Sequence, residues 1–258
     1  MITVTNLKKS FGDKEVLKGI STVFHAGKTN LIIGTSGSGK TVFIKNLVGL
    51  FQPTSGSIMY DDIEFTQLSH KEKKQIRMQI GMLFQGSALF DSMTVEENVL
   101  FPLDMFTNMT RKEKLNQVNS CLERVNLHGA NDKYPGEISG GMMKRVGIAR
   151  AIVLNPKYLF CDEPNSGLDP KTSLVIDELL TTITHEFNIT TIINTHDMNS
   201  VIGMGEKVIF LHQGYKEWEG SSTEILQSDN QVLNDFIFPS DFLKGLRKGA
   251  EQNLMNKK

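Results

Sequence analysis

Several features are scarce in this sequence of 258 residues, and each absence narrows the class of protein. Two cysteines are too few for a disulfide framework, which favours a reducing compartment such as the cytosol. No apolar run approaches the roughly 18 residues of a membrane-spanning helix, and the alternating, then charged N-terminus is unlike a signal peptide. With 28 basic and 29 acidic residues, the chain lacks the positive surplus typical of nucleic-acid binding. Any membrane association is therefore expected to come through a partner.

What is present is the composition of an ordinary globular protein, with 39% apolar and 22% charged residues. Short apolar runs typical of buried strands, such as residues 158–163 and 207–212, alternate with helical patterns, such as residues 169–187. This alternation predicts an α/β fold with a mainly parallel sheet. Residues 87–154 are mainly helical in pattern and predict an inserted subdomain.

The stretch GTSGSGKT, called the phosphate loop below, lies between an apolar run and a helical pattern. It fits G-x-x-x-x-G-K-[ST], in which glycines let backbone N–H groups surround phosphate oxygens at a helix N-terminus. Lys40 is expected to reach the β- and γ-phosphates, and Thr41 to ligate Mg²⁺. A Gly/Ser-rich surface loop is the alternative, but the strand-loop-helix context favours nucleotide binding. The predicted ATP-binding residues of this loop are Gly34, Thr35, Ser36, Gly37, Ser38, Gly39, Lys40 and Thr41.

A second candidate segment, YLFCDEP, is an apolar run that ends in two adjacent carboxylates. Neighbouring strand residues point to opposite sides, so Asp162 can face Mg²⁺ while Glu163 faces the γ-phosphate. Glu163 would then be the general base that polarises the attacking water. Alone, an acidic pair at a strand end is usually only solvated. Together with the phosphate loop, it predicts a catalytic site.

A third segment, ISGGM at residues 138–142, is called the signature segment below. Ser139 is a suitable N-cap, so a helix is expected to begin here whatever the protein does. A Ser-Gly-Gly helix N-terminus is also a second phosphate-binding element.

Six motifs occur in the order found in ABC-type ATPase domains, and together they resemble that family up to about residue 237. They are the phosphate loop, Gln85, the signature segment, Asp162 with Glu163, the SGLD stretch at residues 166–169, and His196. The resemblance implies a P-loop NTPase (RecA-like) core with an antiparallel β subdomain and an inserted α-helical subdomain at about residues 87–154. It also implies one ATPase domain over residues 1–237, followed by a C-terminal tail at residues 238–258.

The same resemblance implies roles for individual residues, with ATP as substrate and Mg²⁺ as cofactor. Phe11 takes the aromatic position that stacks on adenine, and Val16 packs beside it. Gln85 contacts Mg²⁺ or the attacking water, and His196 contacts the γ-phosphate. The family also implies a head-to-tail dimer, in which one chain's phosphate loop and the other chain's signature segment share each ATP. The residues implied at this junction are Ser139, Gly140, Gly141 and Asp169.

The sequence departs from the common family pattern in two places. The signature segment has Ile138 and Met142 where Leu and Gln are common, and the phosphate loop has Thr35 where Pro is frequent. Neither departure removes a group that touches phosphate, so ATPase activity is still expected.

A single ABC-type domain without heptad arrays favours a transporter motor over the soluble ABC machines of translation or repair. The stretch from Met82 to Leu103, together with SGGM at residues 139–142, most resembles the ATPase of Mce-type lipid transporters, the phospholipid-asymmetry (Mla) systems. That resemblance implies a phospholipid or related cargo, an integral-membrane permease, a periplasmic Mce-domain protein, and a place at the cytoplasmic face of the inner membrane. An importer of an amino acid or a metal complex is the alternative.

The C-terminal tail is basic and weakly amphipathic. A solvated end is the expectation, and a contact with the second ATPase subunit or a small regulatory partner is the alternative.

Overall fold

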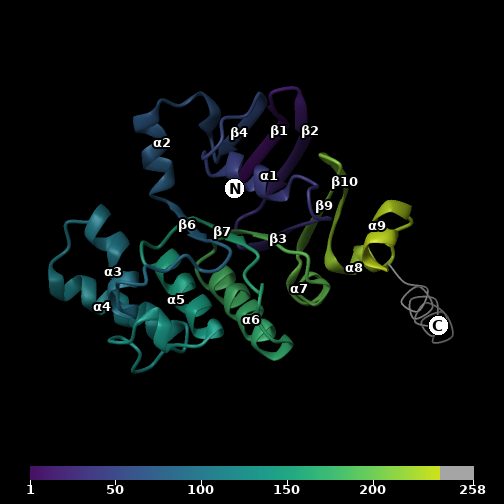
Figure 1. Ribbon diagram of the computed structural model, residues 1–258. Helices are drawn as coiled ribbons and strands as arrows, with labels where there is room; N and C mark the ends of the chain where they lie inside the picture. The colour runs from purple at the N-terminus through teal and green to yellow at the C-terminus, as the bar shows by residue number, and fades with distance from the viewer. Residues whose placement is uncertain (239–258) are drawn as a thin grey trace.

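The structure is a computed structural model that describes residues 1–238. Two β-sheets form its framework, and helices pack on both faces of the larger one (Figure 1). The tail predicted at residues 238–258 therefore lies almost wholly outside the described residues. Within residues 1–238, no helix is both long enough and apolar enough to cross a bilayer.

The smaller sheet is antiparallel and has the strand order β2-β1-β4-β5. Its strands alternate buried and exposed positions along much of their length, as expected for a sheet with one buried face. They are β1 (Ile2–Phe11), β2 (Lys14–Phe24), β4 (Ser55–Tyr60) and β5 (Ile63–Glu64).

The larger sheet has the order β10-β9-β3-β8-β7-β6 and is parallel except for β10. Its strands are β3 (Lys28–Ile33), β6 (Ile80–Leu83), β7 (Tyr158–Asp162), β8 (Thr190–Asn194), β9 (Lys207–His212) and β10 (Tyr215–Gly220). Four neighbouring strands, β3, β8, β7 and β6, have their carboxyl ends at one edge. The phosphate loop, His196, Glu163 and Gln85 follow these four strands, so the sheet order alone brings them together.

The helices lie mostly on one face of the larger sheet, whereas α1 and the smaller sheet cover the other (Figure 1). Reciprocal capping boxes fix the starts of α2, α3, α4 and α8. The helices are α1 (Lys40–Leu47), α2 (His70–Arg77), α3 (Val95–Phe106), α4 (Arg111–Arg124), α5 (Gly140–Ile152), α6 (Pro170–Glu186), α7 (Met198–Met204), α8 (Ser222–Leu226) and α9 (Gln231–Ile237), with 3₁₀ turns at Phe65–Gln67 and Pro135–Glu137.

Alternate side chains of the larger sheet point to opposite faces and contribute to two separate apolar cores. In β3, Ile32 belongs to the core under the smaller sheet and α1, while Leu31 and Ile33 belong to the core shared with α3 to α9. In β7, Phe160 and Cys161 divide in the same way. The sheet is therefore buried on both faces, and its carboxyl edge is held rigidly from two sides.

Candidate nucleotide site

The phosphate loop connects β3 to α1 through glycines in left-handed backbone conformations. Gly34 has φ 151°, Gly37 φ 80° and Gly39 φ 107°. A side chain at Gly34 would clash with the carbonyl oxygen of Leu211, and a Cβ at Gly39 would lie 2.9 Å from Leu17 Cδ2. Backbone angle and neighbouring atoms together favour glycine at Gly34 and Gly39, whereas at Gly37 only the backbone angle does, because a Cβ there would meet nothing within 4 Å.

Lys40 begins α1 and turns its side chain back into the loop. Its Nζ donates to the carbonyl oxygens of Gly34 at 2.7 Å and Thr35 at 3.1 Å. The residue is only 8% exposed. Burial lowers the pKa of the Lys40 ammonium, while Glu163 and Asp162 act in the opposite direction. This buried cation is held where it would meet an anion entering the loop.

Glu163 and His196, which follow β7 and β8, are in direct contact. Nδ1 of His196 lies 2.9 Å from the carboxylate of Glu163. Asn194 Nδ2 donates to Asp162 Oδ1 at 2.5 Å, which fixes the second carboxylate on the neighbouring strand. The two acids thus take different partners, with Asp162 at the end of β7 and Glu163 just after it.

A cavity of about 810 Å³ joins these groups. It is lined by Gln85, Glu163 and His196 together with Val16 and most of the phosphate loop. Three further lining residues were not predicted from the sequence: Val42, Asn194 and Phe236. Asn194 could have been suspected from its polar side chain at the end of an apolar strand. Phe236, in α9, has no sequence signal of this kind.

Other predicted site residues lie outside that cavity. Phe11 is 45% exposed and packs edge-on against Phe51, with ring centroids 5.3 Å apart, instead of lining the cavity wall. Ser139 is exposed and caps α5 by accepting a hydrogen bond from the Met142 N–H at 3.3 Å. Asp169 is also exposed and caps α6.

The glycines of the signature segment differ in their surroundings. Gly140 is exposed, and a Cβ there would make only an ordinary contact of 3.8 Å with Leu168. Gly141 is buried, and a Cβ there would lie 2.7 Å from Thr172 Cγ2. Ser139 and Gly140 of the signature segment therefore lie on the surface of the chain, and no residue of the segment lines the cavity of the phosphate loop.

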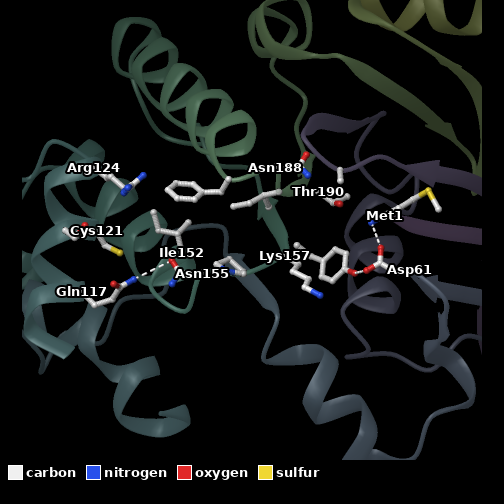
Figure 2. A pocket seen from close by; sticks show the side chains of 16 residues that line it. Met1, Asp61, Gln117, Cys121, Arg124, Ile152, Asn155, Lys157, Asn188 and Thr190 are labelled. Carbon is white, nitrogen blue, oxygen red and sulfur yellow. Dashed lines mark hydrogen bonds and ion pairs between the residues drawn. The ribbon is translucent and has the colours of Figure 1, made fainter. Parts of the chain in front are cut away.

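A second cavity, of about 530 Å³, lies between α4 and the amino ends of β7 and β8 (Figure 2). Two of its charged groups have partners: Asp61 accepts from the Tyr158 hydroxyl at 2.6 Å, and Arg124 contacts Glu186 at 2.7 Å. None of the predicted site residues lines it. It is therefore separate from the nucleotide site.

The phosphate-loop cavity fits a nucleoside triphosphate. The buried Lys40 ammonium and most of the phosphate loop line it, whereas Ser38, whose buried hydroxyl has no hydrogen-bond partner among the described residues, does not. For Mg²⁺, the Thr41 hydroxyl and the Gln85 amide line the cavity, and Asp162 supplies the carboxylate next to it. Within residues 1–238 no cluster of three or more His, Cys, Asp or Glu is placed to bind a metal, so phosphate oxygens would complete such a site.

The family described as ABC transporter matches residues 17–166, which contain the phosphate loop, Gln85, the signature segment and Glu163. The chain belongs to the ABC transporter ATP-binding family. A probable ribonucleotide transport ATP-binding protein of Mycobacterium leprae is 39% identical over 92% of this chain and 68% of its own length. A methionine import ATP-binding protein of Campylobacter jejuni is 39% identical over 94% of this chain and 77% of its own length.

Among solved structures, an ATP-binding cassette captured as a dimer in a post-hydrolysis state with ADP and Pi is similar to this ABC protein. The TM-score is 0.78 at 32% identity, over 86% of this chain and 99% of that chain. The predicted fold class is confirmed. The protein is an ATP-binding ATPase, the motor subunit of a membrane ABC transporter. The roles of its individual residues remain predictions.

Proposed function

We propose that this ATPase works as a head-to-tail pair on a permease, and that the transporter moves phospholipids or related lipids between inner and outer membranes. The observation that carries the pairing is the incompleteness of the site in one chain. The cavity of Lys40 and Glu163 contains no signature residue, while Ser139 and Gly140 lie exposed on α5. A second copy facing the first would bring its signature segment to the phosphates, and ATP would then hold the two copies together.

In the proposed reaction, backbone N–H groups of the phosphate loop and Lys40 bind the phosphates of ATP. Thr41, Gln85 and Asp162 would hold Mg²⁺, which neutralises part of the phosphate charge when bound. Glu163 accepts a proton from water while the water oxygen bonds to the γ-phosphorus and the bond to ADP breaks.

His196 keeps the base in place for this step. An Nδ1–H of His196 donating to the Glu163 carboxylate fixes its orientation, since the two groups already lie 2.9 Å apart. With a hydrogen on both ring nitrogens, the Nε2–H at the other side of the ring would donate to the γ-phosphate. Loss of the γ-phosphate removes the contacts that hold the pair closed.

The proposed permease contact is a groove of about 440 Å³ next to Gln85, between α2, β6, α3 and α5. Phe84, Phe90 and Phe106 line it and are all exposed apolar side chains, which commonly mark a partner site. Among the apolar residues that follow Gln85, Phe90 is 41% exposed, whereas Leu89 packs against the core and Met93 is half-buried. The groove would receive a permease segment at the cytoplasmic face of the inner membrane.

The lipid cargo is supported by the stretch from Met82 to Leu103 and by Met142 in the signature segment, which resemble Mce/Mla-type ATPases. The permease would in turn contact a periplasmic Mce-domain protein, and a small regulatory subunit would be a further partner. Import of a small solute is the second candidate, favoured by the similarity to a methionine import protein.

Co-purification from detergent-solubilised membranes tests the proposal. A tagged chain carrying Glu163→Gln is isolated with ATP, and its protein partners and extractable lipids are identified by mass spectrometry. An untagged membrane sample processed in parallel serves as the control for adventitious lipid. We expect a permease, an Mce-domain protein and enriched phospholipid. A soluble solute-binding protein and no lipid above the control would contradict the lipid assignment and support the second candidate.

A further inference from the structure

Lys144 is a buried lysine in α5, just after the signature segment. It is 4% exposed, although lysine is rarely buried unless it is paired. Its one hydrogen bond within residues 1–238 runs from Nζ to the backbone carbonyl oxygen of Glu163, at 3.4 Å. Burial lowers the pKa of the Lys144 ammonium, and the neighbouring Cys161, Glu163 and Asp162 oppose that shift. The Lys144 side chain thus lies next to the backbone at the carboxyl end of β7, where Asp162 and Glu163 are located.

Glu163 has an unusual backbone conformation that its neighbours must hold. Its φ is 51°, in the left-handed region that few non-glycine residues adopt. Its N–H donates to the Asn194 carbonyl at 2.9 Å, and its own carbonyl accepts from the Ser166 N–H at 3.2 Å. Lys144 supplies the third contact, from α5. Three separate segments therefore fix the peptide groups that set the direction of the Glu163 side chain.

The buried ammonium is not explained by packing. An apolar side chain of the same length would fill the space without the cost of removing a charge from water. A single long hydrogen bond compensates only part of that cost. The position of Lys144 therefore indicates a role for its donor group at Glu163.

We infer that Lys144 is a positioning residue for the general base: its hydrogen bond to the Glu163 carbonyl holds the backbone conformation that aims the carboxylate at the attacking water. The inference rests on the proposed function, because it takes Glu163 as the base. It also gives α5 two roles. The N-terminus of α5 faces the partner's ATP, while Lys144 acts on the base of its own chain.

The test compares two substitutions of Lys144 in the full chain. Lys144→Met shortens the side chain by one atom and removes the donor, whereas Lys144→Gln has the same shorter length and keeps a neutral N–H donor. Because a misplaced catalytic group costs up to about a hundredfold in rate, we expect Lys144→Met to lower kcat about ten- to a hundredfold with KM for ATP unchanged. Lys144→Gln should retain most of the turnover. Lys112→Met, at an exposed position of α4, is the control for losing a lysine.

A second measurement separates positioning of Glu163 from damage to the signature segment. ATP-driven dimerisation is compared between Glu163→Gln and the double variant Glu163→Gln/Lys144→Met by light scattering. The inference predicts equal dimerisation. It is overturned by weaker dimerisation of the double variant, by wild-type turnover of Lys144→Met, or by equal losses in the Met and Gln variants. If Glu163→Gln alone keeps normal turnover, the proposed role of Glu163 fails, which is a different result from a failure at Lys144.

Discussion

Glu163→Gln is the perturbation whose effect follows most directly from the site geometry. The amide has nearly the size of the carboxylate and can still accept a hydrogen bond from His196 across the 2.9 Å contact. What it cannot do is accept a proton from water. Since a general base contributes about 10²- to 10⁴-fold, the barrier should rise by about 3 to 5 kcal/mol.

Binding of ATP should survive the same change. Glu163 opposes the lowering of the Lys40 pKa, so its negative charge acts on the cation that meets the phosphates. Removing that charge leaves Asp162 as the acid acting on Lys40 and takes a negative charge away from the phosphates, so we expect affinity equal to or tighter than that of the wild type.

The assay pairs phosphate release under saturating ATP with a direct nucleotide-binding titration. Glu178→Gln, at an exposed position of α6 outside the cavity, is the matched control and should behave as the wild type. Turnover of Glu163→Gln within threefold of the wild type, or a parallel loss of ATP binding, would refute the assignment of Glu163 as base.

Three further predictions concern other parts of the molecule. Lys40→Met should weaken ATP binding about ten- to a hundredfold in equilibrium titration, because a charge-assisted hydrogen bond is lost; unchanged affinity would place the phosphates elsewhere. Gln85→Ala should leave ATP affinity nearly unchanged but reduce stimulation of the ATPase by reconstituted permease, because Gln85 lines the nucleotide cavity and its neighbour Phe84 lines the proposed permease groove; equal stimulation would show that Gln85 does not couple the two sites. Burial raises the pKa of the Cys121 thiol to about 11 and also raises the pKa of the Cys161 thiol, so both thiols stay protonated at pH 8. A thiol reagent should therefore label them only after unfolding, and rapid labelling of the native protein would contradict their burial.

The strands and helices that flank the motifs were predictable because their sequences carry strong local signals. β3, the phosphate loop and α1 follow the expected strand-loop-helix order, and α6 and β9 lie close to their predicted ranges. β2 was not predicted, since Gly19 and several charged residues weaken its apolar alternation. Its pairing with β1 over the whole strand, a tertiary effect, decides its structure.

The site could be predicted as a set of residues but not as an arrangement. The contact between Glu163 and His196 depends on β7 and β8 being neighbours in the sheet, which local sequence does not specify. The same holds for Lys144, whose position in a helical pattern gave no sign of its contact with Glu163. Phe11 shows the converse: family resemblance assigned it to adenine, and the structure leaves it against Phe51 at the surface.

Mixing two inactive variants tests the central claim, that ATP is hydrolysed at a site shared by two copies. Glu163→Gln removes the base, and Gly140→Asp places a carboxylate at the exposed signature position, where the added Cβ has room. Each variant alone should be inactive. Random mixing makes half of the dimers mixed, with one complete site of two, so the mixture should regain about a quarter of wild-type ATPase activity. A mixture as inactive as either variant alone would contradict the shared site.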